Sequence, residues 1–252
     1  MTVTVGWGLL VALVVFVAIA TVASRAAGLG LARAQAFAAV RAIVQLAGVS
    51  LVITVAVQSI WGALAFSAFM FSVGVWTTTS RVGARRAWPW TVVAMAAGVV
   101  PVLALVFVTG AAPLNGVSIV ALGGIVIGNM MTGHTLAGRR CFAELRENRG
   151  IYEAALALGF TRRESIRRVL APVVAEALIP NLDQTRTVGL VTLPGAFIGV
   201  LLGGGSPLQA GAAQVLVLIG VMAGQALTVT TAASLMERAL LLPPDLAESL
   251  QP

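Results

Sequence analysis

The feature that most constrains this chain is a series of seven long apolar stretches separated by short connectors. A helix needs about 20 apolar residues to cross the roughly 30 Å hydrocarbon core of a bilayer. Because lipid offers no hydrogen bonds, a spanning segment is either a helix or a barrel strand, and the alternating pattern of barrel strands is missing here. The chain is therefore predicted to be an all-α polytopic membrane protein of about seven transmembrane helices. The stretches cover residues 6–24, 37–57, 61–80, 90–110, 117–137, 188–203 and 208–235.

Composition agrees with this fold class. Of the 252 residues, 59% are hydrophobic and only 10% are charged, with a mean hydropathy of +0.98. A soluble domain carries about 25% charged residues and has no way to hide so much apolar surface. The stretch 188–203 is short, so its helix is expected either to begin earlier, near Ala175, or to be partly re-entrant.

The basic residues predict how the chain is oriented. All 16 are arginines, and all but Arg41 fall in one set of alternate connectors or at the end that follows the last stretch. The positive-inside rule therefore predicts an N-terminus outside the cell and a C-terminus in the cytoplasm of a multi-pass protein in the plasma or inner membrane. No basic residue precedes Arg25, so the first stretch is expected to be a retained helix rather than a cleaved signal peptide.

The one sizeable hydrophilic segment, about residues 139–186, has the pattern of two short helices. Residues 153–158 are good helix formers, and Gly159 suits the left-handed position that ends a helix. Thr161 and Glu164 form a capping box, so a second helix is expected to begin at once. Its apolar residues share one face, which predicts an amphipathic helix lying along the inner membrane surface. These apolar residues are Ile166, Val169 and Leu170.

Three interpretations of this segment are open. A helix–turn–helix for DNA has a similar pattern, although a place between two membrane spans argues against it, and no nucleic-acid partner is expected. A surface loop whose arginines only set topology is the second. The third rests on Glu153-Ala154-Ala155 with Gly159 following, which resembles the coupling motif of ABC-transporter permeases. There the short helix seats in a cleft of the ATP-hydrolysing subunit. The coupling residues are then Glu153, Ala154, Ala155, Leu158, Gly159 and Phe160.

Further motifs resemble those of one family, the FetB-like permeases, which are bacterial iron exporters related to plant aluminium-tolerance permeases. The resemblance spans roughly residues 25–238. Its motifs are Arg41-Ala42-Ile43-Val44-Gln45-Leu46, Gly128-Asn129-Met130-Met131, Ile179-Pro180, Asp183, Thr187-Val188-Gly189-Leu190-Val191-Thr192-Leu193-Pro194-Gly195 and Ser206-Pro207. Departures occur at Gln209, where relatives often carry a charge, and before Gln214, where an aromatic residue is missing. These departures bear on the substrate more than on the transport machinery.

The resemblance implies that residues 1–252 form a single transmembrane permease domain containing one short cytoplasmic coupling helix. It implies a homodimer in membrane lipid that works with two copies of a cytoplasmic ABC ATPase and exports metal ions, iron first among them. The chain itself would bind no cofactor and have no catalytic residue, since ATP and Mg²⁺ would reside in the partner. With no lysine anywhere, the chain has no phosphate-binding Gly-x-x-x-x-Gly-Lys loop of its own.

Polar residues inside the stretches or close to their ends predict a translocation pathway. Arg41 and Gln45 share a helical face, although Arg41 also lies close enough to the headgroups to snorkel to them. Asp183 and Arg186 are spaced to form either a structural pair or a gate. Methionine sulfur and imidazole suit soft or borderline metals, so Met130, Met131 and His134 are candidate metal ligands, with helix packing as the alternative. The complete predicted pathway is Arg41, Gln45, Asn129, Met130, Met131, His134, Asp183, Arg186 and Gln214.

Two other function classes compete with an ABC permease. A secondary, ion-coupled transporter of a small solute is the main alternative, but such proteins commonly carry carboxylates within the membrane, and none of the nine acidic residues falls in the interior of a predicted span. A membrane-embedded enzyme would have one histidine, one cysteine and no buried acid pair from which to build a site. The sequence therefore predicts a transport subunit and leaves its substrate and direction open.

Overall fold

The computed structural model describes residues 6–251, which are almost entirely helical and contain no β-strand. The chain divides into two compact units, one ending at Gln58 and the other beginning at Ser59. The first unit is a pair of helices, α1 (Trp7–Ala26) and α2 (Ala32–Ala56), which pack against each other. The Ser24 hydroxyl donates a hydrogen bond to Gln35 Oε1 at 2.7 Å across this pair.

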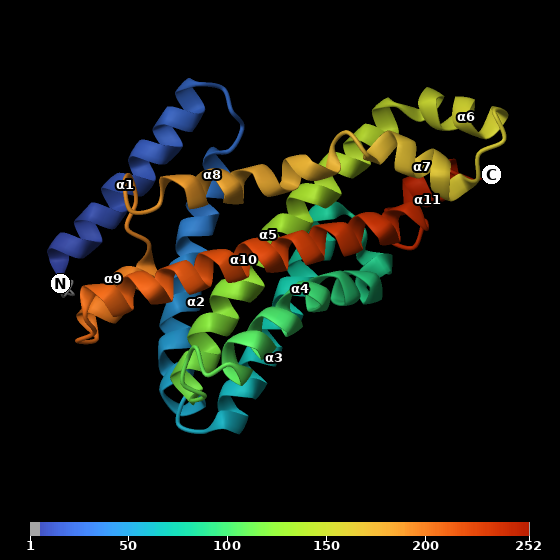
Figure 1. Cartoon of the computed structure of the whole chain (residues 1–252). Coiled ribbons are helices and arrows are strands. Elements are labelled where there is room, and N and C mark those ends of the chain that lie inside the picture. The colour runs from blue at the N-terminus through green and yellow to red at the C-terminus, as the bar shows by residue number, and fades with distance from the viewer. Residues whose placement is uncertain (1–5, 252) are drawn as a thin grey trace. The chain divides into compact units, whose positions relative to one another are not determined.

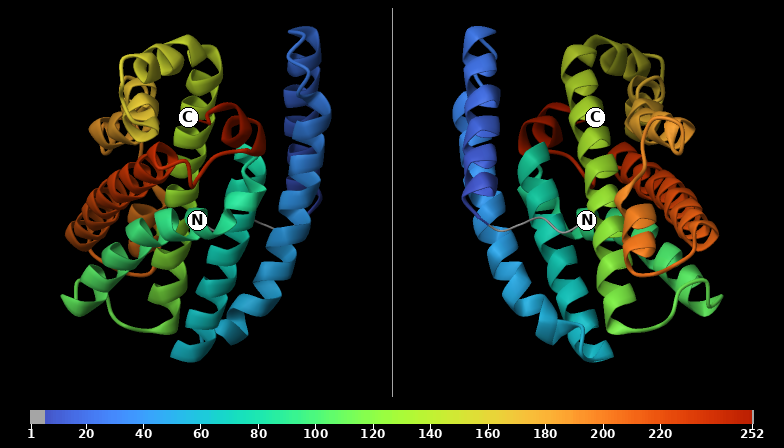
Figure 2. Two further views of the ribbon diagram at one scale, coloured as in Figure 1. Left: turned by 90° about the vertical axis from the view of Figure 1, so that its right-hand side faces the viewer. Right: turned by 90° about the vertical axis from the view of Figure 1, so that its left-hand side faces the viewer.

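The second unit contains all the other helices and is shown in Figures 1 and 2. Its long helices are α3 (Ile60–Val82), α4 (Trp88–Val108), α5 (Gly116–Glu147) and α10 (Pro207–Glu237). The short helices are η1 (Arg85–Ala87), α6 (Arg149–Ala157), α7 (Arg162–Leu170), η2 (Val174–Leu178), α8 (Ile179–Thr187), α9 (Gly195–Leu202) and α11 (Pro244–Ser249). Within this unit α3 packs on α5 and α4 packs on α10, while α5 also contacts α4 and α10.

Six helices of residues 6–251 are long and apolar enough to cross a membrane, namely α1, α2, α3, α4 with η1, α5 and α10. They correspond to six of the seven predicted stretches, which confirms an all-α, multi-pass membrane protein. The main difference in length is at α5, which continues past Ala137 to Glu147 because the polar residues after Ala137 are also good helix formers.

The remaining stretch, 188–203, forms no continuous spanning helix. α8 ends at Thr187 and α9 does not begin until Gly195. Pro194 lacks a backbone donor and disfavours a helical conformation in the residue before it, and it is the extended residue that directly precedes α9. Gly189 adopts φ +83° in the break, and its amide donates to the Thr192 carbonyl at 2.9 Å. With eight residues, α9 is about 12 Å long, well short of the bilayer core.

Close contact between helices of the bundle depends on small residues. A Cβ added to Gly98 of α4 would clash with the Gly224 carbonyl and the Thr228 hydroxyl of α10. On α10, a Cβ added at Gly224 would lie 3.0 Å from the sulfur of Met130 on α5. The three helices therefore meet at a point where only glycine leaves room, as is common between membrane helices.

Candidate functional site

The hydrophilic segment folds as a tight helical hairpin, α6–α7. α6 ends in a Schellman motif: the amide of Gly159 donates to the Leu156 carbonyl at 2.9 Å and that of Phe160 to the Ala155 carbonyl at 3.1 Å. Gly159 has φ +87°, a conformation that favours glycine. α7 then begins with the predicted capping box between Thr161 and Glu164. Both features confirm the prediction of two short helices joined by a tight turn at Gly159.

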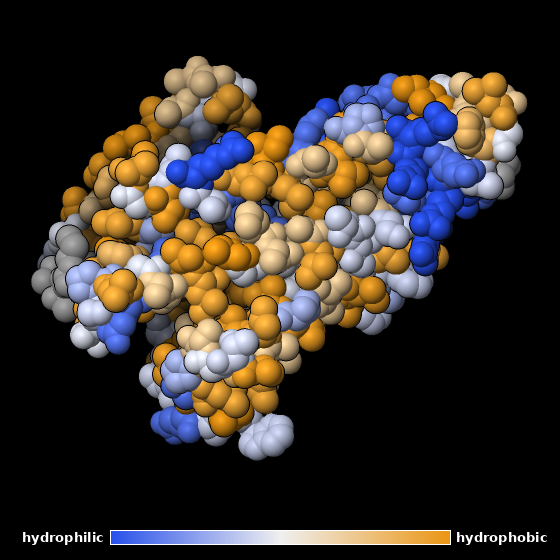
Figure 3. Space-filling model, in the orientation of Figure 1, coloured by the Kyte–Doolittle hydropathy of each residue, from blue (hydrophilic) through white to orange (hydrophobic). Residues whose placement is uncertain are grey.

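The predicted coupling residues divide between the two sides of this hairpin. Ala155 is buried and Phe160 is half-buried, with the guanidinium of Arg168 stacked 4.0 Å over the Phe160 ring. Glu153, Ala154, Leu158 and Gly159 are exposed. The Leu158 side chain is 78% exposed at the tip, although it is apolar. In Figure 3 hydrophilic residues gather at the end of the unit that carries α6 and α7, with apolar residues at its tip.

The apolar face of α7 is buried in the protein, so this face is not available to bind a membrane, and the place of α7 along the inner membrane surface stays a prediction. Ile166, Val169 and Leu170 are at most 2% exposed and belong to one hydrophobic cluster with residues of α5 and α10. The cover is completed by the segment after α10, whose apolar side chains fill the same cluster. These side chains are Leu241, Leu242, Leu246 and Leu250.

Polar contacts fix this last segment to the hairpin. The Tyr152 hydroxyl of α6 donates a buried hydrogen bond to the Leu250 carbonyl at 2.9 Å. Arg146, near the end of α5, pairs with Asp245 of α11 at 2.8 Å. Arg163 of α7 lies 3.7 Å from Glu237 at the end of α10. The hairpin, α11 and the ends of α5 and α10 are thus joined by both packing and hydrogen bonds, and α6, α7 and α11 lie together in Figure 1.

Two carboxylates of this assembly are held in their charged form. Hydrogen bonds from the side chain and backbone of Thr161 lower the pKa of Glu164 below its usual 4.5. A hydrogen bond from Arg146 lowers the pKa of Asp245 below its usual 3.8. Both groups are therefore ionised at neutral pH, when the capping box and the α5–α11 contact are formed.

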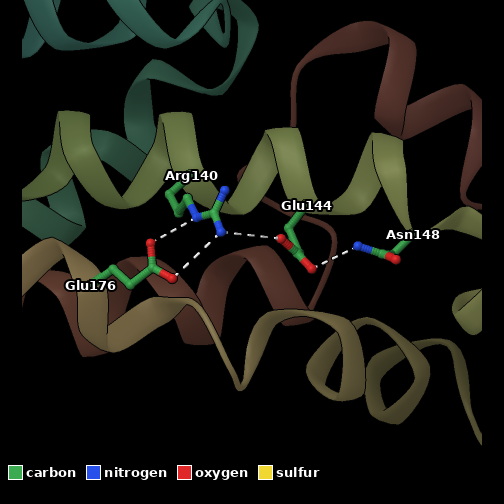
Figure 4. Close-up of polar contacts among 4 residues, drawn as sticks. All are labelled: Arg140, Glu144, Asn148 and Glu176. Atoms are coloured by element: carbon green, nitrogen blue, oxygen red, sulfur yellow. Dashed lines mark hydrogen bonds and ion pairs between the residues drawn. The ribbon is translucent and has the colours of Figure 1, made fainter.

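A chain of polar contacts leads from the start of α6 toward α8, as Figure 4 shows. Asn148, which precedes α6, donates to Glu144 at 2.7 Å, and Arg140 lies 3.8 Å from Glu144. The Nε of Arg140 donates to Glu176 of η2 at 2.8 Å. η2 leads directly into α8, so the hairpin is connected to α8 both through these side chains and along the backbone from α7.

A cavity of about 250 Å³ lies between α5, α8, α9 and α10. Four carboxamide side chains line it: Asn129 of α5, Asn181 and Gln184 of α8, and Gln214 of α10. The amide of Phe197 near the start of α9 donates to Gln214 Oε1 at 3.3 Å. Pro194, Gly195 and Ala196, where α9 begins, complete one wall. Pro194, the last residue of the break in the sixth stretch, thus lies in the cavity wall.

The predicted metal ligands do not line this cavity. Met130 is fully buried, and its sulfur packs where α4 and α10 meet α5. His134 is also fully buried, and neither of its ring nitrogens has a hydrogen-bond partner among residues 6–251. Met131 is half-buried beside the apolar cluster around Met95. The described part of the chain holds no group of three His, Cys, Asp or Glu residues placed to bind a metal.

The other predicted pathway residues lie in separate places. Asn129 and Gln214 both line the cavity. Asp183 and Arg186 form an exposed pair on α8, with 3.5 Å between Arg186 Nη1 and Asp183 Oδ1. Arg41 and Gln45 lie on α2 of the first unit, where both are exposed. Their roles in transport stay predictions.

Sequence reasoning missed Asn181, Gln184 and Tyr152. Asn181 and Gln184 are three residues apart on α8, directly after the Ile179-Pro180 element, and this spacing places them on one helical face. That signal was available in the sequence. Tyr152 differs, because its contact with Leu250 joins residues far apart in the chain and leaves no local pattern.

Comparison with known proteins adds independent evidence. Residues 7–241 match the family described as an uncharacterised protein family, UPF0014. The UPF0014 membrane protein STAR2 of Oryza sativa subsp. japonica is 32% identical over 211 residues, 82% of this chain and 74% of the rice protein. The probable iron export permease protein FetB of Escherichia coli (strain K12) is 27% identical over 150 residues, 58% of this chain and 56% of that protein.

A further relative, the protein ALUMINUM SENSITIVE 3 of Arabidopsis thaliana, is 34% identical over 99 residues, covering 39% of this chain and 36% of the plant protein. These matches confirm the resemblance expected from the motifs that begin at Arg41, Gly128 and Thr187. No solved structure matches the chain.

Proposed function

The chain belongs to the UPF0014 family of membrane permeases, and from this premise we propose that it is the membrane-spanning subunit of an ATP-binding-cassette transporter. A separate cytoplasmic chain hydrolyses the ATP, and two copies of each chain form the complete transporter. The transported substrate is a metal ion, with iron the first candidate because one relative is named a probable iron export permease.

The observation that carries this proposal is the rigid α6–α7 hairpin with its exposed apolar tip. Leu158 is 78% exposed at the tip of this hairpin and Ile151 of α6 is 52% exposed, which fits an apolar surface that another protein covers. Leu158 and Ala154 supply the apolar contact, and Glu153 lies beside them, paired with Arg149 at 2.8 Å. This is the coupling surface, and the ATPase chain is its partner.

The hairpin also has a route by which to transmit motion. α7 leads along the backbone through η2 into α8. In addition, Arg140 of α5, the helix that leads into α6, pairs with Glu176 of η2. A displacement of the hairpin therefore moves α8 as well. α8 carries Asn181 and Gln184 into the cavity. Nucleotide-driven movement at the coupling surface would therefore change the wall of the cavity, which is what a transport cycle requires.

The test is affinity purification of the full chain from membranes of its own host, followed by identification of co-purifying proteins. A protein with a Walker motif is expected in the wild-type sample. It should be lost from Gly159→Pro, because proline cannot adopt φ +87° and lacks the amide that donates to Leu156.

The matched control is Gly150→Pro in the same hairpin. Gly150 is the second residue of α6, the position that proline already occupies in α4 and α8, and a Cβ there meets no atom within 4 Å. The control should keep both membrane insertion and the partner. Retention of the partner by Gly159→Pro would contradict the coupling role.

A secondary, ion-coupled transporter is the second candidate, favoured by the interrupted helix α8–α9, a feature common in that class. The two candidates differ in their energy source. In proteoliposomes that contain the chain and any co-purified ATPase, an ABC transporter moves its substrate only when ATP is supplied. Transport by the chain alone, driven by a proton or sodium gradient, would select the second candidate.

A further inference from the structure

The turn between α3 and α4 presents three arginines without an acidic partner. They are Arg81 near the end of α3 and Arg85 and Arg86 of η1, and all three are exposed. No acidic residue precedes Glu144 in the sequence, and within residues 6–251 none of the three arginines forms an ion pair. The turn thus concentrates positive charge that the described part of the protein does not neutralise.

The backbone of this turn is held by hydrogen bonding and by packing. α3 ends at Gly83, which has φ +75°, and the amide of Ala84 donates to the Thr79 carbonyl at 3.0 Å. Between the arginines, apolar residues are buried in the hydrophobic cluster that also packs the hairpin α6–α7. These residues are Val82, Ala84 and Ala87. The turn therefore lies at the same end of the second unit as the hairpin, which the proposed orientation places in the cytoplasm.

Exposed tryptophans flank the three arginines. Trp76 of α3 is 65% exposed, and Trp88 at the start of α4 is 57% exposed. The guanidinium carbon of Arg85 lies 5.7 Å from the centroid of the Trp76 ring, within the range of a cation–π contact. Because its ring is apolar and its N–H is polar, tryptophan gathers at the headgroup level of a bilayer. We call Trp76, Arg81, Arg85, Arg86 and Trp88 the arginine–tryptophan patch.

The chemistry of this patch selects an anionic phospholipid. A guanidinium presents its N–H donors in a planar fork that matches the oxygens of a phosphate. Arginines next to a membrane are also attracted to the anionic lipids of the cytoplasmic leaflet. A free phosphate would contact the arginines and leave the tryptophan rings exposed. The rings belong at the depth of the headgroups, which favours a lipid over an acidic protein surface.

We infer that the arginine–tryptophan patch binds the phosphate of an anionic phospholipid from the cytoplasmic leaflet. The site goes beyond the proposed function, because it requires neither a nucleotide nor a transported ion. A lipid that binds only the folded protein stabilises it. Since the turn packs on the cluster that holds the hairpin, this stabilisation acts at the end of the unit that carries the coupling surface.

The experiment measures lipid binding to the purified full chain in detergent by native mass spectrometry. Its probes are dioleoyl phosphatidylglycerol and dioleoyl phosphatidylcholine, which share their acyl chains and differ in headgroup charge. The wild type should bind phosphatidylglycerol about tenfold more tightly, because one arginine near the surface favours anionic lipid about fivefold. The double variant Arg85→Gln, Arg86→Gln should reduce this preference to about twofold. Arg86→Gln alone, which keeps the contact of Arg85 with Trp76, should reduce it to an intermediate value.

The matched control is the double variant Arg163→Gln, Arg167→Gln in α7. Both arginines are exposed at the same end of the unit, and their removal changes the net charge equally, but α7 contains no tryptophan. The control should keep the full preference for phosphatidylglycerol. An equal loss in the control would show that only net charge matters and would overturn the site, as would an unchanged preference in both variants of η1.

Two further outcomes separate this lipid from other partners. Excess soluble glycerol phosphate should not displace phosphatidylglycerol, because it lacks acyl chains beside the tryptophans; displacement would indicate a site for free phosphate and contradict the inference. If the η1 double variant loses the co-purifying ATPase but binds phosphatidylglycerol as the wild type does, the patch contacts protein and the lipid site falls. If no ATPase co-purifies while lipid preference depends on Arg85 and Arg86, the lipid site stands and the ABC assignment falls.

Discussion

Buried polar side chains in the second unit serve two different purposes at the scale of single residues. Gln225 of α10 donates through Nε2 to the Asn129 carbonyl of α5 at 2.9 Å, which joins two long helices. Asn129, Asn181 and Gln214 instead face the cavity. Since a buried polar group is costly without a partner, the Gln225 bond stabilises the bundle, while Gln214 in the cavity wall accepts from the Phe197 amide and so fixes the start of α9.

Tyr152→Phe is a test of the contact between α6 and Leu250. The change keeps the ring that fills the cluster and removes only the hydroxyl that donates to the Leu250 carbonyl. The unfolding free energy of the hairpin region should fall by about 1 kcal/mol, the usual net value of such a bond. Amide hydrogen exchange of residues 149–170 measures it, and protection equal to that of the wild type would show that the bond contributes nothing.

The carboxylates of Glu164 and Asp245 predict how the hairpin depends on pH. Their pKa values are lowered in the folded protein, so their stabilising contribution is complete above the usual values of 4.5 and 3.8 and is lost as the pH falls through the lowered values. Exchange of residues 149–170, corrected for its intrinsic pH dependence, should therefore rise as the pH falls below about 4. In Glu164→Gln this rise should be smaller, and a flat profile in the wild type would contradict the prediction.

Some of these residue contacts could be predicted from the sequence, and others could not. The capping box of Thr161 and Glu164 and the left-handed Gly159 depend only on neighbours in the chain, and both are confirmed. Asn129 and Gln214, which were predicted in one pathway, line the same cavity, and their role in transport stays a prediction. Tyr152 depends on a contact with Leu250, a distant segment, which no local pattern encodes.

At the scale of elements, α11 acts as a cover for the hairpin. Leu246→Asp should disrupt this cover, because Leu246 is 3% exposed inside the apolar cluster and a buried carboxylate without a partner is strongly unfavourable. The expected result is higher proteolytic sensitivity of α6–α7 and loss of the co-purifying ATPase, with membrane insertion retained. The control is Leu240→Asp, at a leucine that is 37% exposed, and an equal effect of both variants would argue against a specific role for α11.

The crossing of α4 and α10 supplies a second prediction at this scale. Gly98→Val should lower the thermal stability of the purified protein by about 3 kcal/mol, because the added atoms meet the Gly224 carbonyl and the Thr228 hydroxyl. Gly211→Val is the comparison, since a Cβ at Gly211 of α10 meets nothing within 4 Å. Equal unfolding temperatures for the two variants would show that the close approach is not required.

Element prediction succeeded where hydrophobicity decides the outcome and failed where covalent geometry or tertiary packing does. Six apolar stretches form continuous helices because burial in lipid requires it. The stretch that contains Pro194 breaks instead, although it is equally apolar. The amphipathic pattern of Ile166, Val169 and Leu170 correctly predicted a buried face, but periodicity does not say whether lipid or protein covers it, and here protein does.

For the whole molecule, the proposed orientation has the N-terminus outside and the hairpin in the cytoplasm. It can be tested with single cysteines in a Cys141→Ser background. Leu158→Cys lies at the 78% exposed hairpin tip, and Leu114→Cys lies in the connector before α5, where the leucine is 59% exposed. In intact cells a membrane-impermeant maleimide should label position 114 only, and in inverted vesicles position 158 only. The opposite pattern would reverse the orientation.

The buried position of Leu250 also determines when the hairpin can complete its packing during synthesis. The ribosome makes α7 long before the segment 241–250 that covers its apolar face. Until that segment emerges, Ile166, Val169 and Leu170 of a nascent chain have only part of their cover, and the hairpin lacks its bond to Leu250. A truncated translation product would thus expose apolar surface of the kind that chaperones and proteases recognise, and it would be removed before it could assemble.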